Sequence, residues 1–397
     1  MPNETMTDLQ RQLDLLRARI ARIDRKYQNP NAHDLTEGVE VENQAGRHWQ
    51  ITRTWPSSFR HGSADVGALC ELPANHIGDD SPPSRWVFVD TETTGLAGGA
   101  GTVPFLVGAG WITSSGFELR QFFMRDYDEE PSLLTSLSEL LSGFDWIVTY
   151  NGRAFDQPLL ETRYRMTRIP EPFPRLHHLD LLHDARRLWR LRLESCRLQD
   201  LEQRILNVER HGDVDGAFIP EIYFYYLRTR DATKLQPVLS HNAVDILSLA
   251  CLTAIVPAFF KEPQSLTQAT EMIGLGRWFR NEGRLDEALD LMRRAIHRPL
   301  PEALQYETLW HMADLERKLG REDAALALWS ELSTITNPWR GKALERLAIY
   351  YEHRERNYTM ALELTLQALA IEATDELHRR RARLSGKAGA PKPGRLL

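Results

Sequence analysis

The sequence predicts a mixed α/β domain, in which helices flank a β-sheet, followed by an all-α domain of repeated helix pairs. Three observations lead to this prediction. The chain has 397 residues, which is long for a single hydrophobic core. From residue 85 onward, short apolar runs typical of strands alternate with helical patterns. From residue 265 onward, helix pairs recur with Gly and Ala at matching positions.

The first 84 residues are predicted to contain one helix and little else. Apolar side chains between Met6 and Tyr27 step by threes and fours, which predicts an amphipathic helix over residues 1–27. At about three heptads this helix is marginal as a free dimer, so it is as readily expected to dock on its own protein. Residues 28–84 are rich in Asn, Asp, His, Pro and Gly with one strand-like run at 49–55, and we expect a loosely structured lead-in.

The α/β domain is predicted over residues 85–262. Its expected elements are strands at 86–89, 102–113, 117–124 and 146–149 and a helix at 131–141, with mainly helical structure over 157–260. The apolar run from Ile246 to Phe260 is shorter than a membrane span and contains Pro257. We therefore expect a buried helix there and no association with a membrane.

The second domain is predicted over residues 265–374 as three degenerate repeats with a period near the tetratricopeptide length. Small residues such as Gly276, Ala313 and Ala348 would let paired helices approach closely. An ordinary helical bundle is the alternative, since the repeats differ in length and Glu316 stands where an aromatic residue is expected. Residues 375–397 are basic and lose the pattern, so a disordered tail is expected.

Composition narrows the class of protein. With 42% hydrophobic and 26% charged residues, the chain is typical of a soluble globular protein. Its net charge of −6 argues against a uniformly basic nucleic-acid binder, although a local patch could still bind. The three cysteines are far apart and form no C-x-x-C pair, which indicates neither disulfides nor a zinc site. No export signal opens the chain, so a cytoplasmic location is expected.

Two carboxylates end the first predicted strand of the α/β domain. Asp90 and Glu92 are two residues apart, so the alternation of a strand points both to one side of the sheet. Paired carboxylates beside an apolar strand repel each other unless a cation neutralises them, and divalent ions take oxygen ligands. A metal site is the economical explanation, although D-x-E alone is a weak motif.

Two further segments carry polar residues of the same kind. Asp156 starts a helix after the turn Asn151-Gly152, where an Asp is most often a structural N-cap. His241 and Asp245 are four residues apart and share one face of a helix. Asp245 opens a strongly apolar run, which is unusual for a carboxylate unless it has a function.

Together these segments resemble the three motifs of DEDD-type exonucleases, in the same order. They are D-x-E at 90–92, N-G-x-x-F-D-x-x-L-L at 151–160 and H-N-x-x-D at 241–245. With Asp90-Thr-Glu-Thr-Thr-Gly-Leu96, His178-Leu-Asp-Leu-Leu-His183 and Gly212-Asp-Val-Asp-Gly216, residues 85 to 256 resemble the YprB-like ribonuclease-H-type family. Its members likewise carry tetratricopeptide-like repeats behind the nuclease.

The resemblance implies a ribonuclease-H-like fold and a two-metal-ion nuclease. Asp90, Glu92, Asp156 and Asp245 would hold two Mg²⁺ or Mn²⁺ ions, and His241 would be the general base. His241 precedes Asp245 by four residues, whereas histidine-type DEDD enzymes usually have a spacing of five, so its role is less certain than that of the acids. The resemblance further implies 3′→5′ cleavage, with DNA repair beside a helicase as a setting.

Two other functions stay open. The chain could be a scaffold whose nuclease-like domain only binds nucleic acid and whose repeats recruit a partner, although the presence of all four acids counts against this. It could also be an exoribonuclease, since no residue can be identified that would read a 2′-hydroxyl. DNA is the expected substrate, and a helicase or another protein is a possible partner of the repeats.

Overall fold

The structure is a computed structural model that describes residues 33–71, 81–95 and 101–388. The chain divides into two compact units. The first comprises Met1–Ala185 and Ser195–Ala258, and the second comprises Arg186–Glu194 and Phe259–Leu397. The helix predicted over residues 1–27 lies outside the described residues.

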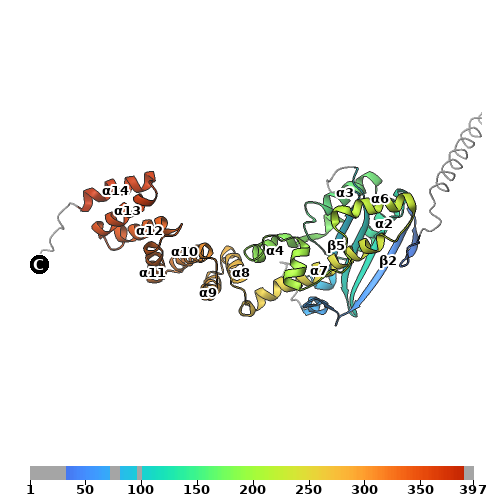
Figure 1. Ribbon diagram of the computed structural model, residues 1–397, viewed down its shortest axis with the longest axis horizontal. Coiled ribbons are helices and arrows are strands. Elements are labelled where there is room, and N and C mark those ends of the chain that lie inside the picture. The colour runs from blue at the N-terminus through green and yellow to red at the C-terminus, as the bar shows by residue number, and fades with distance from the viewer. Residues whose placement is uncertain (1–32, 72–80, 96–100, 389–397) are drawn as a thin grey trace, which may run out of the picture. The chain divides into compact units, whose positions relative to one another are not determined.

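A seven-stranded mixed sheet forms the centre of the first unit (Figure 1). Its strands are β1 (Val39–Asn43), β2 (Gly46–Pro56), β5 (Trp86–Thr93), β6 (Pro104–Thr113), β7 (Gly116–Phe123), β8 (Trp146–Thr149) and β9 (His177–Asp180). They lie in the order β1-β2-β7-β6-β5-β8-β9. The pairs from β1 to β5 are antiparallel, whereas β8 pairs parallel with both β5 and β9. A small hairpin joins β3 (Arg60–His61) to β4 (Ala64–Asp65).

Helices flank this sheet, as the sequence predicts (Figure 1). They are α2 (Glu130–Leu141), α3 (Asp156–Thr167), α4 (Leu181–Trp189), α5 (Leu198–Leu201), α6 (Ile219–Thr229) and α7 (Leu235–Lys261). One hydrophobic core joins Val87, Val89 and Val107 of the central strands to leucines of α2 and tyrosines of α3 and α6. The mixed sheet with flanking helices confirms the predicted fold class of this domain.

The predicted loosely structured lead-in over residues 28–84 is wrong for its middle part. Strands β1 and β2 belong to the main sheet, and β2 pairs with β7 along its length from Trp49 to Pro56. Ile51 and His48 are fully buried, and the His48 ring bonds to the Ser132 hydroxyl of α2 at 2.9 Å. The strand-like run predicted at 49–55 lies within β2, whereas β1 was missed because its five residues are mostly exposed.

The long helix α7 carries the apolar run that the sequence predicts to be buried. By length and composition α7 could cross a membrane. However, 67% of its most apolar window is buried inside the protein. Such burial is typical of the core helix of a globular domain. The prediction of mainly helical structure over 157–260 missed β9, a strand of only four residues at the edge of the sheet.

The second unit consists of helices. They are α8 (Ala269–Asn281), α9 (Leu285–Ile296), α10 (Glu302–Lys318), α11 (Glu322–Thr334), α12 (Arg340–His353), α13 (Tyr358–Ile371) and α14 (Asp375–Ala388). Consecutive helices pair as α8 with α9, α10 with α11 and α12 with α13. Ala288, Ala313, Ala348 and Ala368 are fully buried, as expected of small residues at close helix contacts. These pairs confirm the all-α domain and fit the predicted repeats.

Buried glutamates take part in the packing of the repeats. Glu316, which departs from the expected aromatic pattern, is buried and pairs with Arg293 and Arg321. Glu352 of α12 is likewise buried and pairs with Arg380 and Arg383 of α14. An ion pair in the interior therefore stands where a tetratricopeptide-like repeat would place apolar contacts.

The predicted disordered tail over residues 375–397 is wrong for 375–388, which form α14. Leu377 and Leu384 of this helix are buried. Glu352 binds the basic side chains that made the segment resemble a tail, and Arg383 holds the pKa of this carboxyl at about 2. The basic segment therefore packs as a helix, because a buried acid of α12 pairs with several of its basic side chains.

Glu352→Ala is expected to destabilise the second unit by about 3 kcal/mol, because it leaves the guanidinium of Arg380 without its carboxylate partner. Chemical denaturation measures the loss, and limited trypsin digestion reports release of α14. Glu363→Ala, at an exposed position on α13, is the control and should change stability by less than about 0.5 kcal/mol. Equal effects of the two substitutions would contradict the role given to Glu352.

Candidate metal centre

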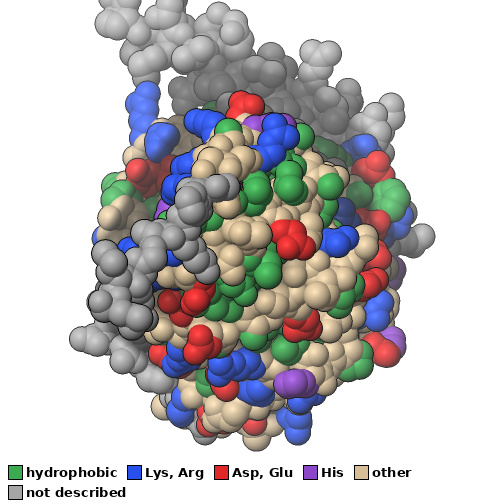
Figure 2. Space-filling view, turned by 90° about the vertical axis from the view of Figure 1, so that its left-hand side faces the viewer, with side chains coloured by type: hydrophobic (Ala, Val, Ile, Leu, Met, Phe, Trp, Pro, Cys, Tyr) green, Lys and Arg blue, Asp and Glu red, His purple; other side chains and the backbone are tan. Residues whose placement is uncertain are grey.

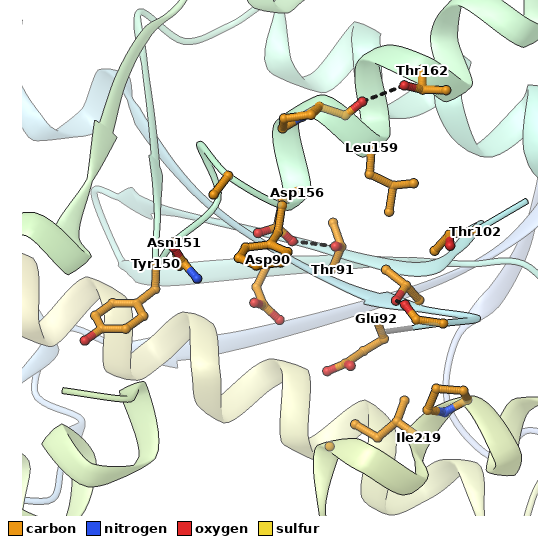
Figure 3. Close-up of a pocket in the computed structure, with 17 residues that line it drawn as sticks. Asp90, Thr91, Glu92, Thr102, Tyr150, Asn151, Asp156, Leu159, Thr162 and Ile219 are labelled. Atoms are coloured by element: carbon orange, nitrogen blue, oxygen red, sulfur yellow. Dashed lines mark hydrogen bonds between the residues drawn. The ribbon is translucent and has the colours of Figure 1, made fainter. Parts of the chain in front are cut away.

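Strand β5 presents Asp90 and Glu92 on the side of the sheet that faces α7. Asp90 pairs in register with Gly108 of β6, and Asn242 of α7 reaches the same spot, donating to Asp90 Oδ2 at 2.8 Å. Glu92 Oε1 lies 4.0 Å from His241 Nε2 of α7. The two carboxylates thus point to one side of the sheet, as strand alternation predicts (Figure 3).

Asp156 reaches the same place from a turn and helix after β8. Asn151 adopts a left-handed conformation, with a φ of 64°, which Asn tolerates better than most residues. The buried Asp180 of β9 holds this turn by accepting from the backbone N–H groups of Asn151 at 2.8 Å and Arg153 at 3.2 Å. Thr91 of β5 donates to Asp156 Oδ1 and so fixes the carboxylate beside the strand (Figure 3).

Helix α7 supplies the last two predicted residues. His241 and Asp245 share one face, and His241 Nε2 lies 3.6 Å from Asp245 Oδ2. His241 is 7% exposed, so it is a core residue of the cluster and not a surface pair with Asp245. The five predicted site residues therefore come together from β5, α3 and α7.

The close approach of α7 to the sheet depends on two glycines of β6. A Cβ at Gly108 would lie 2.2 Å from Asn242 Oδ1 and 2.3 Å from Ile246 Cδ1. A Cβ at Gly110 would lie 2.7 Å from Ile246 Cγ2. Because any side chain at these positions would push α7 away, the glycines keep the ligands of the helix near those of the strand.

Arg210 lies at the edge of the cluster and was not among the predicted site residues. Its guanidinium forms a bidentate pair with the buried Glu202, with both N···O distances 2.6 Å. It also donates to Asp245 Oδ1 and to Asp213 Oδ2. The segment 212–216, which carries part of the family resemblance, thus takes part in the site, because Asp213 also contacts His241. Arg210 precedes a Gly-rich turn in the sequence and lies in no motif, so nothing short of the fold reveals it.

Burial raises the pKa values of all four acids. Burial is the largest cause for Asp90, whose pKa is raised well above its usual range, with further repulsion from Asp245 and Asp156. Burial likewise raises the pKa values of Glu92 and Asp245. The pKa of Asp156 is raised to about 6 by burial. The cluster therefore holds more negative charge than Arg210 neutralises, which is the condition that a divalent cation relieves.

A cavity of about 580 Å³ opens beside these carboxylates. Asp90, Glu92 and Asp156 line one part of it (Figure 3). The apolar part includes Phe155, Leu159 and Ile219. Phe155 is 56% exposed, which is unusual for a large apolar side chain next to three acids. With a cation held by these acids, the cavity would suit a ligand that joins an anionic group to a flat apolar one.

The donor set fits a hard divalent cation. Carboxylate oxygens are the ligands that Mg²⁺, Ca²⁺ and Mn²⁺ prefer, and four of them converge here from three elements. Glu92, His241 and Asp245 each offer one ligand atom, and these atoms lie within 4.8 Å of one another. The arrangement can therefore hold a cation and present it to the cavity.

Comparison with known proteins gives two findings. A family model described as the RNase_H superfamily matches residues 87–256. A protein of Bacillus subtilis (strain 168), with the printed name "Uncharacterized protein YprB", is 33% identical over 352 residues, which cover 84% of each chain. The first match spans β5 to α7, and the second extends into the helical unit.

Proposed function

Because this chain belongs to the ribonuclease H superfamily, in the family of the Bacillus subtilis protein YprB, we propose that it is a divalent-metal-dependent exonuclease. Proteins with this fold are typically nucleases that use divalent metal ions, so nucleic acid is the substrate class. The observation that carries the proposal is the convergence of Asp90, Glu92, Asp156 and Asp245, with raised pKa values, beside a cavity that the first three of them line.

In this proposal the residues divide the work of hydrolysing a phosphodiester bond. The four acids hold two Mg²⁺ or Mn²⁺ ions, which when bound supply a Lewis acid for the phosphate and lower the pKa of water. Asn242 holds Asp90 and Thr91 holds Asp156, so that both carboxylates keep their orientation. His241 aims Nε2 at the same carboxylates.

The shape of the cavity supports cleavage at a strand end. Its volume of about 580 Å³ lies in the range of single small-molecule sites. The exposed ring of Phe155 can stack on a base while the scissile phosphate lies against Asp90 and Glu92. Figure 2 looks onto the side on which α13 and α14 lie in Figure 1, and acidic, basic and apolar side chains are interspersed there.

The test is cleavage of single- and double-stranded DNA and matched RNA, labelled at either end, with Mg²⁺, Mn²⁺ or EDTA. We expect metal-dependent shortening from the 3′ end, with DNA preferred, and loss of activity in Asp90→Ala/Glu92→Ala. The label that is released gives the polarity, and the substrate panel gives the preference between DNA and RNA. No cleavage of any substrate with either ion would favour a scaffold that binds nucleic acid without cutting it.

We propose that the helical second unit binds a protein partner. Its repeat-like helices resemble modules that capture other proteins, so a helicase or another repair protein is the partner that we propose. A DNA-repair role in the cytoplasm is the matching setting. Pull-down with the full chain and with the second unit's surface residues changed would identify the partner.

A further inference from the structure

His241 faces the carboxylate cluster with one ring nitrogen and turns the other away from it. Nε2 lies 3.6 Å from Asp245 Oδ2 and 4.0 Å from Glu92 Oε1. No hydrogen bond to Nε2 is found within residues 33–71, 81–95 and 101–388. The ring is 93% buried, being 7% exposed. A buried ring whose Nε2 has no hydrogen bond among these residues and lies near two carboxylates is placed to bind a cation or a proton.

The other ring nitrogen determines which of these it is. Nδ1 lies 2.8 Å from Asp213 Oδ1 and 3.1 Å from an N–H of Arg210. An ionised carboxylate only accepts, so the shorter contact requires the proton of a neutral ring to be on Nδ1. Nη1 of Arg210 also donates to Asp213 Oδ2, at 3.1 Å. The lone pair of a neutral His241 therefore resides on Nε2 and points into the cluster.

The two carboxylate oxygens of Asp245 face different groups. Arg210 donates to its Oδ1, whereas its Oδ2 faces His241. Glu92 contributes Oε1 from the opposite side. An ion bound at about 2.0–2.2 Å from each ligand allows ligand atoms to be up to about 4.3 Å apart. Both separations from Nε2 are within this limit, and the three ligand atoms lie within 4.8 Å of one another.

We propose that His241 Nε2 is a ligand of one of the bound metal ions, together with Glu92 and Asp245, and that Asp213 is the positioning residue that orients the ring. This inference rests on the proposed function, because it concerns the ions of that site. A ligating His241 replaces the proton-accepting role that the motif resemblance implies. Ligating histidines almost always donate their second N–H to a carboxylate or carbonyl, which is the arrangement of His241 and Asp213.

The choice of ion follows from the ligand. An imidazole nitrogen is a softer donor than a carboxylate, and it favours first-row transition ions over Mg²⁺. The centre should therefore bind Mn²⁺ more tightly than Mg²⁺. Replacement of His241 by Gln should narrow the difference between the two ions, since Gln offers an oxygen instead.

The experiment measures Mn²⁺ binding to the full chain by calorimetry and the surroundings of the bound ion by pulsed electron paramagnetic resonance. We expect hyperfine coupling to a directly bonded nitrogen in the wild type. His241→Gln should remove this coupling and weaken Mn²⁺ binding at least tenfold. Asp213→Asn should weaken binding by about 10- to 100-fold, the usual effect of losing such an orienting partner.

Two controls match these changes on the same loop. His211→Gln alters a histidine that is 88% exposed, and Asp215→Asn alters an acid that caps a neighbouring turn. Both should bind Mn²⁺ as the wild type does. Thermal unfolding of each variant shows whether it is folded, so that lost binding is attributed to the ligand set.

The outcomes separate this inference from the proposed function. Bound Mn²⁺ without nitrogen coupling, in a protein that cleaves nucleic acid, would overturn the ligand role of His241 and leave the nuclease standing. Nitrogen coupling without cleavage of any substrate would support the ligand role and remove the nuclease. Absence of both Mn²⁺ binding and cleavage would overturn both. Unchanged binding in Asp213→Asn would remove its positioning role.

Discussion

Asp156→Asn is expected to lower metal-dependent cleavage by about 10³-fold or more while making the metal-free protein more stable. The loss follows because a missing ligand removes several kcal/mol of stabilisation from the reaction. The gain follows because burial raises the pKa of Asp156 from 3.8 to about 6, so its ionised form is unfavourable in the folded state. A shift of about two units corresponds to up to about 3 kcal/mol at neutral pH. Asn keeps the oxygen that accepts from Thr91.

The sign of the pH dependence follows from the same shift. A carboxyl whose pKa is raised by folding favours the folded state below its unfolded value, and this contribution is lost as the pH rises through the folded value. For Asp156 the window runs from about 4 to about 6. Burial lowers the pKa values of His48 and His178 to about 4, so these residues titrate near this window in both proteins. The difference in unfolding free energy between wild type and Asp156→Asn isolates the carboxyl.

Urea unfolding between pH 4 and pH 7, with EDTA or Mn²⁺, measures this prediction. Mn²⁺ at a hundred times its dissociation constant should stabilise the wild type by about 2.7 kcal/mol and the variant by less. Asp128→Asn changes an exposed acid and serves as the control. A variant that is less stable than the wild type throughout this range would contradict the idea that burial disfavours the ionised form of Asp156 in the metal-free protein.

Arg210→Ala is expected to destabilise the first unit by about 3–5 kcal/mol, because it leaves buried carboxylates without their cation. The side chain of Glu202 is 2% exposed and that of Asp245 is 15% exposed, so water cannot replace the guanidinium well. Divalent metal should recover part of the loss, since an ion at Asp245 supplies the missing positive charge. Chemical denaturation with and without Mn²⁺ measures both effects.

Two comparisons sharpen this result. Arg165→Ala removes an arginine of a solvent-exposed pair with Glu161 and should cost less than about 1 kcal/mol. Glu202→Gln in the Arg210→Ala background should restore some stability, because it removes one of the uncompensated charges. If the double variant were no more stable than Arg210→Ala, lost packing of the arginine and not unpaired charge would explain the effect.

The elements that follow hydrophobic periodicity could be predicted from the sequence. Strands β5 to β8 and helix α2 begin and end within a few residues of the predicted bounds, because their inward side chains repeat in a simple pattern. Strands β1 and β9 were missed because both are short edge strands with few buried side chains, whereas the strand-like run predicted at 49–55 lies within β2. Helix α14 was missed because its stability depends on Glu352, a residue distant in sequence.

The candidate site divides in the same way. Asp90, Glu92, Asp156, His241 and Asp245 stand in local motifs, and the fold brings them together as the motifs imply. Arg210 and Glu202 stand in no motif, and Asp213 lies in the segment 212–216 to which the sequence assigned no role in the site. The roles of all three depend on which segments the fold places beside α7. Residues of a local motif can be recognised from the sequence, whereas residues whose partners are distant in the sequence can be recognised only from the fold.

Gly108 and Gly110 of β6 limit how the distance between α7 and the sheet can change, because they leave α7 against bare backbone. No residue is smaller than glycine, so α7 packs against β6 at these two positions as closely as any residue there would allow. Changes at either position can therefore widen the gap between the two sets of ligands, and none can narrow it. A substitution at either glycine would therefore weaken ion binding by separating the ligands. A second substitution could restore binding only by lengthening a ligand side chain.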